Sequence, residues 1–363
     1  MDGKPFRTET TLLPGTHTVV WNGQPVRVLV SQYTAYLDRR LEEVALDRYA
    51  QADDGSVWYF GEDVFDYRRG TIALTEGTWL AGREGPPAMI MPAHPKVGDV
   101  YRTENAPGIV FEEVTVEETG RTVTGPRGPV HAAMVAQELH SDGATESKLF
   151  APGYGEFRTG GGGDLEALAL AVPTDDARGP LPAALNTLTT GASGMLESAR
   201  IRDWEAAGAT LQTLEAAWRT EQGRSLPPLV AERMAEGVLG LERAVHERNV
   251  GTAVQAAIDV SLSSLDLELQ YRPPTTIDVG RFYLRTQQLR LDAARHDLGD
   301  VAGDVAALEW IRDRIVAAFG PDPLRQVDEG LAALREASDA RNLAAAADHA
   351  ARLGALVRRL AFG

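Results

Sequence analysis

The sequence contains no cysteine, which excludes disulfides, thiolate catalysis, zinc–cysteine sites and iron–sulfur clusters. It also has no run of 18 or more apolar residues, so we expect no transmembrane segment. Positive charge is scarce: 36 Lys and Arg face 52 Asp and Glu, which gives a formal net charge of −16. A chain of this charge lacks the basic face that nucleic acids and anionic membranes require, and we expect neither as a partner.

The 363 residues suggest roughly two domains, and the composition changes near residue 175. The first part carries most of the tyrosines and many β-branched residues, whereas the second is rich in Ala, Leu, Glu and Arg. We therefore predict an α+β protein, with an N-terminal antiparallel, half-barrel-like β-sheet domain at residues 1–172. A linker at 173–180 then leads to an all-α domain of helical hairpins at 181–363.

Turn signals recur through the first part at spacings that fit a meander of strands. Asn22-Gly23 separates strands expected at 17–21 and 25–30, and Arg69-Gly70 separates strands expected at 64–67 and 72–76. Asp53-Asp54-Gly55 marks a further turn before a strand at 57–60. The remaining expected strands are 43–49, 110–119, 121–124, 131–140, 146–150 and 156–159.

A repeat of about 46 residues organises the second part. Short polar residues that suit helix N-caps open four apolar-periodic runs, and each follows a basic or imidazole residue at the end of the preceding helix. The N-cap candidates are Asp203, Asn249, Asp297 and Asn342, and the residues before them are Arg202, Arg248, His296 and Arg341. With further helices at 181–200, 226–247, 275–296 and 321–338, we expect about eight helices, as stacked hairpins or two four-helix bundles. Four acids interrupt the apolar helices and three arginines lie nearby in the sequence, so we expect interhelical ion pairs among Asp259, Asp266, Asp278, Asp292, Arg272, Arg281 and Arg285.

An acidic group gives the first candidate site. Glu62, Asp63, Asp66 and Glu76 lie on strands expected to share one sheet, and converging carboxylates suit a hard cation such as Ca²⁺. We select Glu62, Asp63 and Glu76 as its ligands. The alternative is that they are surface and turn acids of a strongly acidic protein.

Soft ligands gather at only one place in the sequence. Met89, Met91 and His94 occupy a short proline-rich stretch, and thioether and imidazole groups favour copper. His131 and His140 are further candidate ligands. The alternative is that the two methionines fill the core beside Trp79.

A third group, Glu104, Glu138 and Lys148, is interpreted as a buried ion pair or as a clamp for a ligand. The motifs that signal nucleotide cradles and serine hydrolases are missing: there is no Gly-Lys-Ser/Thr and no Gly-x-Ser-x-Gly. No catalytic residue is assigned.

The first part resembles an uncharacterised β-rich domain of exported bacterial proteins and lipoproteins. The resemblance covers roughly residues 10–172 and is carried by residues 58–63 (WYFGED), 76–85 (EGTWLAGREG), 90–101 (IMPAHPKVGDVY) and 151–155 (APGYG). His94 departs from that pattern, because the domain usually has an acid at this position. The helical part, at 265–274, 277–282 and 308–314, resembles a segment of hypothetical actinobacterial proteins. The resemblance implies a fold and an extracytoplasmic location, with a cytoplasmic location left open, and no established activity.

These observations favour an exported ligand- or metal-binding or scaffold protein whose β-domain holds the ligand. Its partner would be a small ligand or a protein. The alternative is a metal- or carboxylate-dependent hydrolase that uses the loop-rich face of the β-domain. A soluble cytosolic interaction protein is the third hypothesis.

Overall fold

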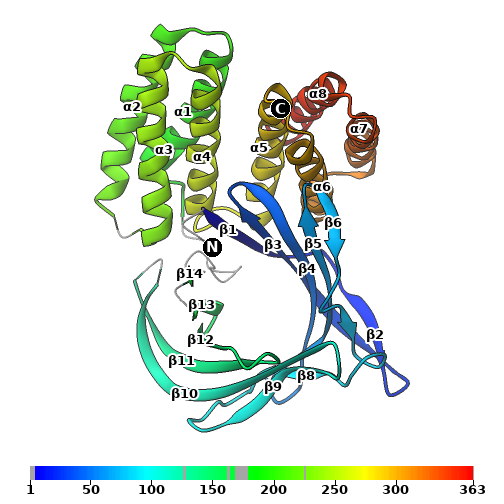
Figure 1. Cartoon of the computed structure of the whole chain (residues 1–363). Helices are drawn as coiled ribbons and strands as arrows, with labels where there is room; N and C mark the ends of the chain where they lie inside the picture. Colours follow the sequence, from blue (N-terminus) through cyan, green and yellow to red (C-terminus); the bar gives the residue numbers. More distant parts are fainter. Residues whose placement is uncertain (1–4, 126–127, 162–163, 168–178, 225, 363) are drawn as a thin grey trace. The chain divides into compact units, whose positions relative to one another are not determined.

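The computed structural model describes residues 5–125, 128–161, 164–167, 179–224 and 226–362, and it shows an α+β protein (Figure 1). Strands occupy the first part of the chain and eight helices the second, as predicted. The chain divides into two compact units: residues 1–124 with 129–169, here called the β unit, and residues 170–363 with 125–128, here called the helical unit. Of the expected linker at 173–180, residues 173–178 lie outside the described part of the chain.

The β unit contains two sheets whose ladders between named strands are antiparallel. The first sheet has the order β1-β3-β4-β5-β6, with β2 paired to β3, and β7 and β8 both paired to β5. Its strands are β1 (Phe6–Leu12), β2 (His17–Trp21), β3 (Gln24–Leu37), β4 (Arg40–Gln51), β5 (Val57–Arg68), β6 (Thr71–Leu74), β7 (Trp79–Leu80) and β8 (Ala88–Met91). The second sheet runs in sequence order from β9 to β14. Its strands are β9 (Val100–Ala106), β10 (Val110–Gly125), β11 (Gly128–His140), β12 (Thr145–Ala151), β13 (Gly155–Gly161) and β14 (Asp164–Ala167).

Two of the predicted hairpin turns have the left-handed backbone that their sequences favour. Asn22 and Gly23 have φ values of 49° and 74°, and Arg69 and Gly70 have 53° and 77°. The predicted strands were too short in two places: 57–60 and 64–67 form the single strand β5, and 110–119 and 121–124 form β10. In both places the strand continues through residues at which the sequence predicted an interruption between two strands.

The helical unit forms two four-helix bundles, the second of the two arrangements expected. Helices α1 (Ala183–Arg200), α2 (Trp204–Gln222), α3 (Pro228–Glu247) and α4 (Val250–Glu268) enclose one apolar core, which includes Leu188, Met195 and Leu241. Helices α5 (Pro274–Ala294), α6 (Leu298–Arg314), α7 (Pro321–Asp339) and α8 (Leu343–Phe362) enclose most of the second, which includes Leu308 and Val327. No helix of the described residues is long and apolar enough to cross a bilayer.

One turn design joins the helices of each hairpin, and it explains the repeat. Asp203, Asn249, Asp297 and Asn342 each accept a backbone N–H of the following helix through the side chain, as predicted for N-caps. The residue before each cap, Arg202, Arg248, His296 or Arg341, has φ between 53° and 61°. In the second turn, the N–H groups of Asn249 and Arg248 donate to the carbonyls of Ala244 and Val245. This is a Schellman motif, so the basic residue follows the helix and sits at its left-handed position.

The two bundles repeat the same packing. Core positions of α1 and α2 recur 94 residues later in α5 and α6, and those of α3 and α4 recur 93 residues later in α7 and α8. Examples of such buried pairs are Leu188 with Phe282, Met195 with Leu289, Leu214 with Leu308, Leu241 with Leu334 and Ala253 with Ala346. The helical unit is therefore built from two copies of one four-helix pattern.

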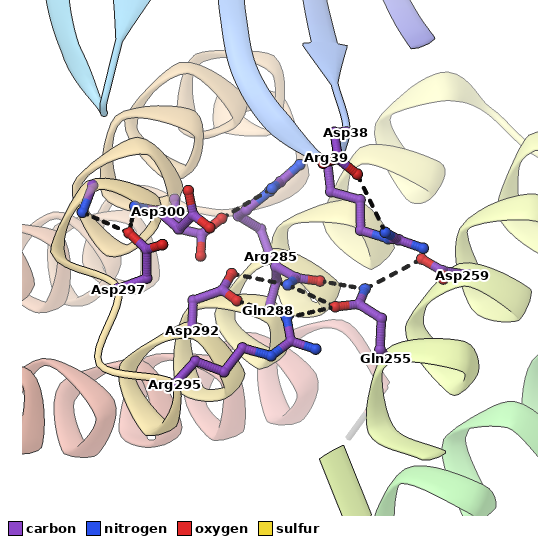
Figure 2. Close-up of polar contacts among 12 residues, drawn as sticks. Asp38, Arg39, Gln255, Asp259, Arg285, Gln288, Asp292, Arg295, Asp297 and Asp300 are labelled. Carbon is purple, nitrogen blue, oxygen red and sulfur yellow. Dashed lines mark hydrogen bonds and ion pairs between the residues drawn. The ribbon is translucent and has the colours of Figure 1, made fainter. Parts of the chain in front are cut away.

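Polar side chains, in contrast, join α4 to α5. Gln255 and Gln288 exchange amide hydrogen bonds, and Gln288 also donates to Asp292 (Figure 2). Further along the same pair of helices, Arg281 donates to Asp266 at 2.8 Å and to Asp278 at 3.0 Å. The Arg281–Asp266 pair joins α5 to α4 and is an interhelical ion pair of the predicted kind, whereas the Arg281–Asp278 pair lies within α5. Each of these buried charges has an opposite charge beside it, as burial requires.

Candidate functional site

Carboxylates accumulate in the interior of the β unit, where burial makes an unpaired charge expensive. They come from both sheets, and they are linked to one another by hydrogen bonds, by ion pairs or through their charges. The group, here called the carboxylate network, comprises Asp47 and Glu62 of the first sheet and Glu104, Glu112, Glu138, Glu146 and Glu156 of the second.

Glu62 and Glu104 connect the two sheets. Burial, followed by the charge of Glu104, raises the pKa of Glu62 to about 10, and the two carboxyl groups are hydrogen-bonded to each other. Burial also raises the pKa of Glu104, while hydrogen bonds from Trp79 and Glu62 oppose that rise. The indole Nε1–H of Trp79 donates to Glu104 Oε1 at 2.8 Å. At neutral pH the shared proton therefore resides on Glu62, and Glu104 is the acceptor.

Aromatic side chains enclose the end of the network that belongs to the first sheet. The hydroxyl of Tyr59 donates to Asp47 Oδ1 at 2.8 Å, and burial raises the pKa of Asp47 to about 6. The Tyr59 ring stacks on that of Tyr49, with centroids 4.9 Å apart, and meets Trp79 edge to face at 5.5 Å. These rings exclude water, which is the physical reason for the desolvation.

Lys148 supplies positive charge to the second sheet's end of the network. Its Nζ lies 2.6 Å from Glu138 Oε2 and 3.8 Å from Glu156 Oε2. Burial by itself lowers the pKa of Lys148, but the carboxylates of Glu156 and Glu138 outweigh it, and the net shift is upward. Thr103 donates to the other oxygen of Glu138 at 3.1 Å. The structure thus brings Glu138 and Lys148 together as the predicted ion pair, with Glu104 in the same network.

Three side chains of this sheet have the spacing of metal ligands. One oxygen each of Glu112 and Glu138 and one ring nitrogen of His140 all lie within 4.8 Å of one another. His140 Nδ1 is 3.2 Å from Glu112 Oε1, and its buried Nε2 lies 3.8 Å from Glu146 Oε2 without a hydrogen-bond partner among the described residues. Burial, with the charges of Glu138 and Glu104, raises the pKa of Glu112 to about 8.

The donor set fits a divalent transition metal better than calcium. Ligands 2.0–2.2 Å from a tetrahedral zinc ion lie about 3.4 Å apart, so pairs as far apart as 4.8 Å must close by up to about 1.4 Å when the ion binds. Calcium prefers oxygen alone, whereas two carboxylates and one imidazole suit Zn²⁺, Mn²⁺ or Fe²⁺. With Nδ1 directed toward the ion, Nε2–H of His140 points toward Glu146, and such outer carboxylates orient metal-binding histidines.

The structure does not bring the predicted calcium ligands to one point. Glu62 and Asp63 are successive residues of β5, so their side chains leave opposite faces of the sheet. Glu62 faces Glu104, whereas Asp63 pairs with Arg48. Glu76 is exposed in the segment between β6 and β7.

The predicted copper ligands also have separate surroundings. Met91 is partly buried against the apolar cluster of Val114, Val116 and Met134, and not against the cluster that contains Trp79, where the alternative interpretation placed it. Met89 is half-buried on β8, where it pairs with Trp58. His94 is exposed and lies near Asp54, in the turn before β5.

Sequence reasoning missed Glu112 as a ligand and considered His140 only as a further candidate for the copper site. In β10 and β11, alternation places Glu112 on the face of Val114 and Val116, and Glu138 on the face of Met134 and Ala136, all four of which are buried. The sequence did contain a signal for these two residues: each acid lies on a face of its strand that is otherwise apolar.

Comparison with known proteins adds no identity: no family model matches the chain, and none of the curated proteins matches it.

Proposed function

We propose that the β unit binds a divalent transition-metal ion through Glu112, Glu138 and His140. The observation that carries this proposal is the convergence of their three ligand atoms within 4.8 Å on one sheet. The excess of acid around them supports it, because Lys148 is the cation paired with Glu138 and Glu156, while Glu104 and Glu146 add further negative charge.

Zinc titration of the full chain tests the proposal. We expect calorimetry to show one site, and His140→Ala to weaken Zn²⁺ binding by about ten- to a hundredfold or more, since it removes a direct ligand. His131→Ala is the matched control, because His131 lies on the same strand but is exposed and contacts Thr122 at 3.0 Å. Equal binding by both variants and the unchanged chain would contradict the proposal.

The same titration separates this site from the two sets predicted from the sequence. Calcium binding that is lost in Glu76→Gln would support the Glu62, Asp63 and Glu76 set. Copper binding that is lost in His94→Ala would support the Met89, Met91 and His94 set. Neither substitution touches the residues of the zinc site, so both variants should bind Zn²⁺ like the unchanged chain.

The hydrolase alternative depends on the same geometry. Three protein ligands leave a coordination position for water, and a zinc-bound water becomes nucleophilic near neutral pH. Zinc-dependent hydrolysis of a chromogenic ester that disappears in His140→Ala, but not in His131→Ala, would favour it over simple binding. The proposal includes the extracytoplasmic location implied by the sequence resemblance, which fractionation of the source cells tests.

A further inference from the structure

One side chain of the β unit occupies a position that suits a cation. The ammonium group of Lys148 lies between two carboxylates: its Nζ is 2.6 Å from Glu138 Oε2 and 3.8 Å from Glu156 Oε2. The three residues come from β11, β12 and β13, which are successive strands of the second sheet (Figure 1). The lysine side chain is 17% exposed and that of Glu138 only 3%, so water and salt screen this contact poorly.

The two oxygens of Glu138 face different partners. Oε1 accepts a hydrogen bond from the hydroxyl of Thr103 at 3.1 Å, and the same hydroxyl lies 3.4 Å from Glu112 Oε2. Oε1 is therefore on the side of Glu112, a proposed metal ligand. Oε2 meets the ammonium group of Lys148 and accepts no hydrogen bond from another side chain among the described residues. Glu138 thus has the arrangement of a carboxylate that bridges two cations, of which the protein supplies one.

The contact between Lys148 and Glu138 has the length of a bond to a hard metal ion. Calcium takes carboxylate oxygens at about 2.3–2.6 Å, and Nζ lies 2.6 Å from Glu138 Oε2. Glu156 Oε2 would need to approach a calcium ion at this position by about 1.3 Å. The Glu156 side chain is 32% exposed, which leaves room for a change of rotamer and for water to complete the coordination.

The charges support the same interpretation. When a divalent ion is bound, Glu112, Glu138 and Glu156 carry three negative charges, and the ion and the ammonium group together supply three positive ones. Burial by itself disfavours the ammonium form, but the charges of Glu156 and Glu138 outweigh it and raise the pKa of Lys148, so the lysine stays protonated. A second divalent ion would add charge that these three carboxylates do not balance.

We propose that Lys148 takes the place of a second metal ion: its ammonium group fills a cation position between Glu138 and Glu156 and so limits the site to a single ion. This role rests on the metal site proposed above, which supplies the first ion. It also makes Lys148 a determinant of selectivity. With Oε2 engaged by the ammonium group, Glu138 offers the metal one oxygen, which suits Zn²⁺ better than Ca²⁺, an ion that takes about six to eight oxygen ligands.

Calcium uptake by the full chain is the test. Lys148→Ala vacates the position and leaves Glu138 and Glu156 without their cation. We expect this variant to gain one Ca²⁺ per chain in equilibrium dialysis and to bind Ca²⁺ about tenfold or more tightly than the unchanged chain does, while Zn²⁺ stays at one ion per chain. Lys148→Arg keeps the positive charge and should gain no Ca²⁺. Lys96→Ala is the matched control, because Lys96 is exposed.

Glu156→Gln, introduced into Lys148→Ala, should weaken the gained Ca²⁺ binding by about tenfold or more, since it removes a charged ligand. If Lys148→Ala folds poorly without metal, Ca²⁺ should restore its far-ultraviolet circular dichroism, as a ligand of the folded state does. The inference is overturned by a folded Lys148→Ala variant that binds no more Ca²⁺ than Lys96→Ala, or by an unfolded one that Ca²⁺ does not restore. A gain of Ca²⁺ that Glu156→Gln leaves unchanged would overturn it as well.

The role of Lys148 and the zinc site fail separately. His140→Ala removes a ligand of the first ion and none of the vacated position, so it tests the zinc site alone. A gain of Ca²⁺ by Lys148→Ala in a chain that binds no Zn²⁺ would support the cation position and contradict the zinc site. Zn²⁺ binding by the unchanged chain, with no gain of Ca²⁺ by Lys148→Ala, would do the reverse.

Discussion

The carboxyl group of Glu62, on β5, is hydrogen-bonded to that of Glu104, on β9, so a proton joins the two sheets of the β unit. Two ionised carboxylates at this separation would repel each other in a poorly solvated interior. The contact therefore exists only while one of the two acids is protonated, and burial assigns that proton to Glu62. The stability of the β unit consequently depends on pH through this pair.

We predict that the free energy of unfolding of the β unit falls as the pH rises from about 5 to 9. The pKa of Glu62 is about 10 in the folded chain and 4.5 without the fold, so between these values the folded state binds the extra proton. Stability then decreases with increasing pH, because the unfolded state releases a proton that the folded state retains. The contribution is fully present below pH 4.5 and is lost as the pH approaches 10. Urea unfolding followed by tryptophan fluorescence measures it.

Glu62→Gln should flatten this dependence, because a glutamine amide donates to Glu104 at every pH. Glu76→Gln, an exposed acid in the same region, is the matched control and should leave the pH profile unchanged. A Glu62→Gln variant whose stability falls with pH as steeply as that of the unchanged chain would show that the proton lies elsewhere in the network.

Gly61, which precedes Glu62, is predicted to tolerate no side chain. Its φ is +111°, and a Cβ there would lie 2.2 Å from the carbonyl oxygen of Trp79. Gly61→Ala therefore forces β5 away from β7 and should destabilise the β unit by at least about 3 kcal/mol. Gly15→Ala isolates the backbone term: Gly15 has φ of +89° but open space around it, and we expect a loss of only about 1 kcal/mol. Equal losses for the two variants would show that the clash is relieved.

Local features of the fold were predictable from the sequence, whereas the site was not. Asn22 and Gly23 form a hairpin turn through their own backbone conformation, and Asn249 caps the first turn of the helix that follows it. A few neighbouring residues are enough to predict each of these features. The turn at Asp38 and Arg39, with φ of 50° and 70°, lacked the usual Asn-Gly signature and was missed, together with the extension of β3 to Leu37. At this turn, the pairing of β3 with β4 imposes a backbone conformation that the residues themselves do not favour.

The carboxylate network illustrates the other limit. Glu104, Glu112 and Glu138 resemble any acids of an acidic chain until the sheet places them on an inward face. The sequence did indicate that Glu138 and Lys148 belong together, since a rare lysine near an acid on a neighbouring strand suggests a pair. The register of the strands, which the whole sheet determines, places His140 beside Glu112 and Glu138.

The repeated helix turns predict a stabilising substitution. Arg248 has φ of 53°, a left-handed conformation that costs a residue with a side chain about 1 kcal/mol relative to glycine. Arg248→Gly should therefore stabilise the helical unit by roughly 0.5–1 kcal/mol in guanidinium unfolding. Gln212→Gly, at an exposed interior position of α2, should instead destabilise it by about 1 kcal/mol. Destabilisation in both variants would indicate that the Arg248 side chain makes a necessary contact.

The duplicated bundle packing leads to the last prediction, which concerns two glycines at equivalent positions. A Cβ at Gly237 of α3 would lie 2.8 Å from Val260 Cγ2, and one at Gly330 of α7 would lie 2.9 Å from Leu353 Cδ1. In each bundle the glycine thus lets the third helix approach the fourth. Gly237→Ala gains helix propensity of about 1 kcal/mol but overpacks against a stiff β-branched side chain, and we expect a net loss of about 1–2 kcal/mol. Gly330→Ala should lose less stability, because Leu353 can change rotamer.

Gly208→Ala is the control, because Gly208 lies in α2 with nothing within 4 Å of the added Cβ. It gains the helix propensity alone and should stabilise the unit by up to about 1 kcal/mol. Guanidinium unfolding monitored at the helical circular dichroism band measures all three, and a stabilised Gly237→Ala variant would show that α3 and α4 are not in close contact at this point.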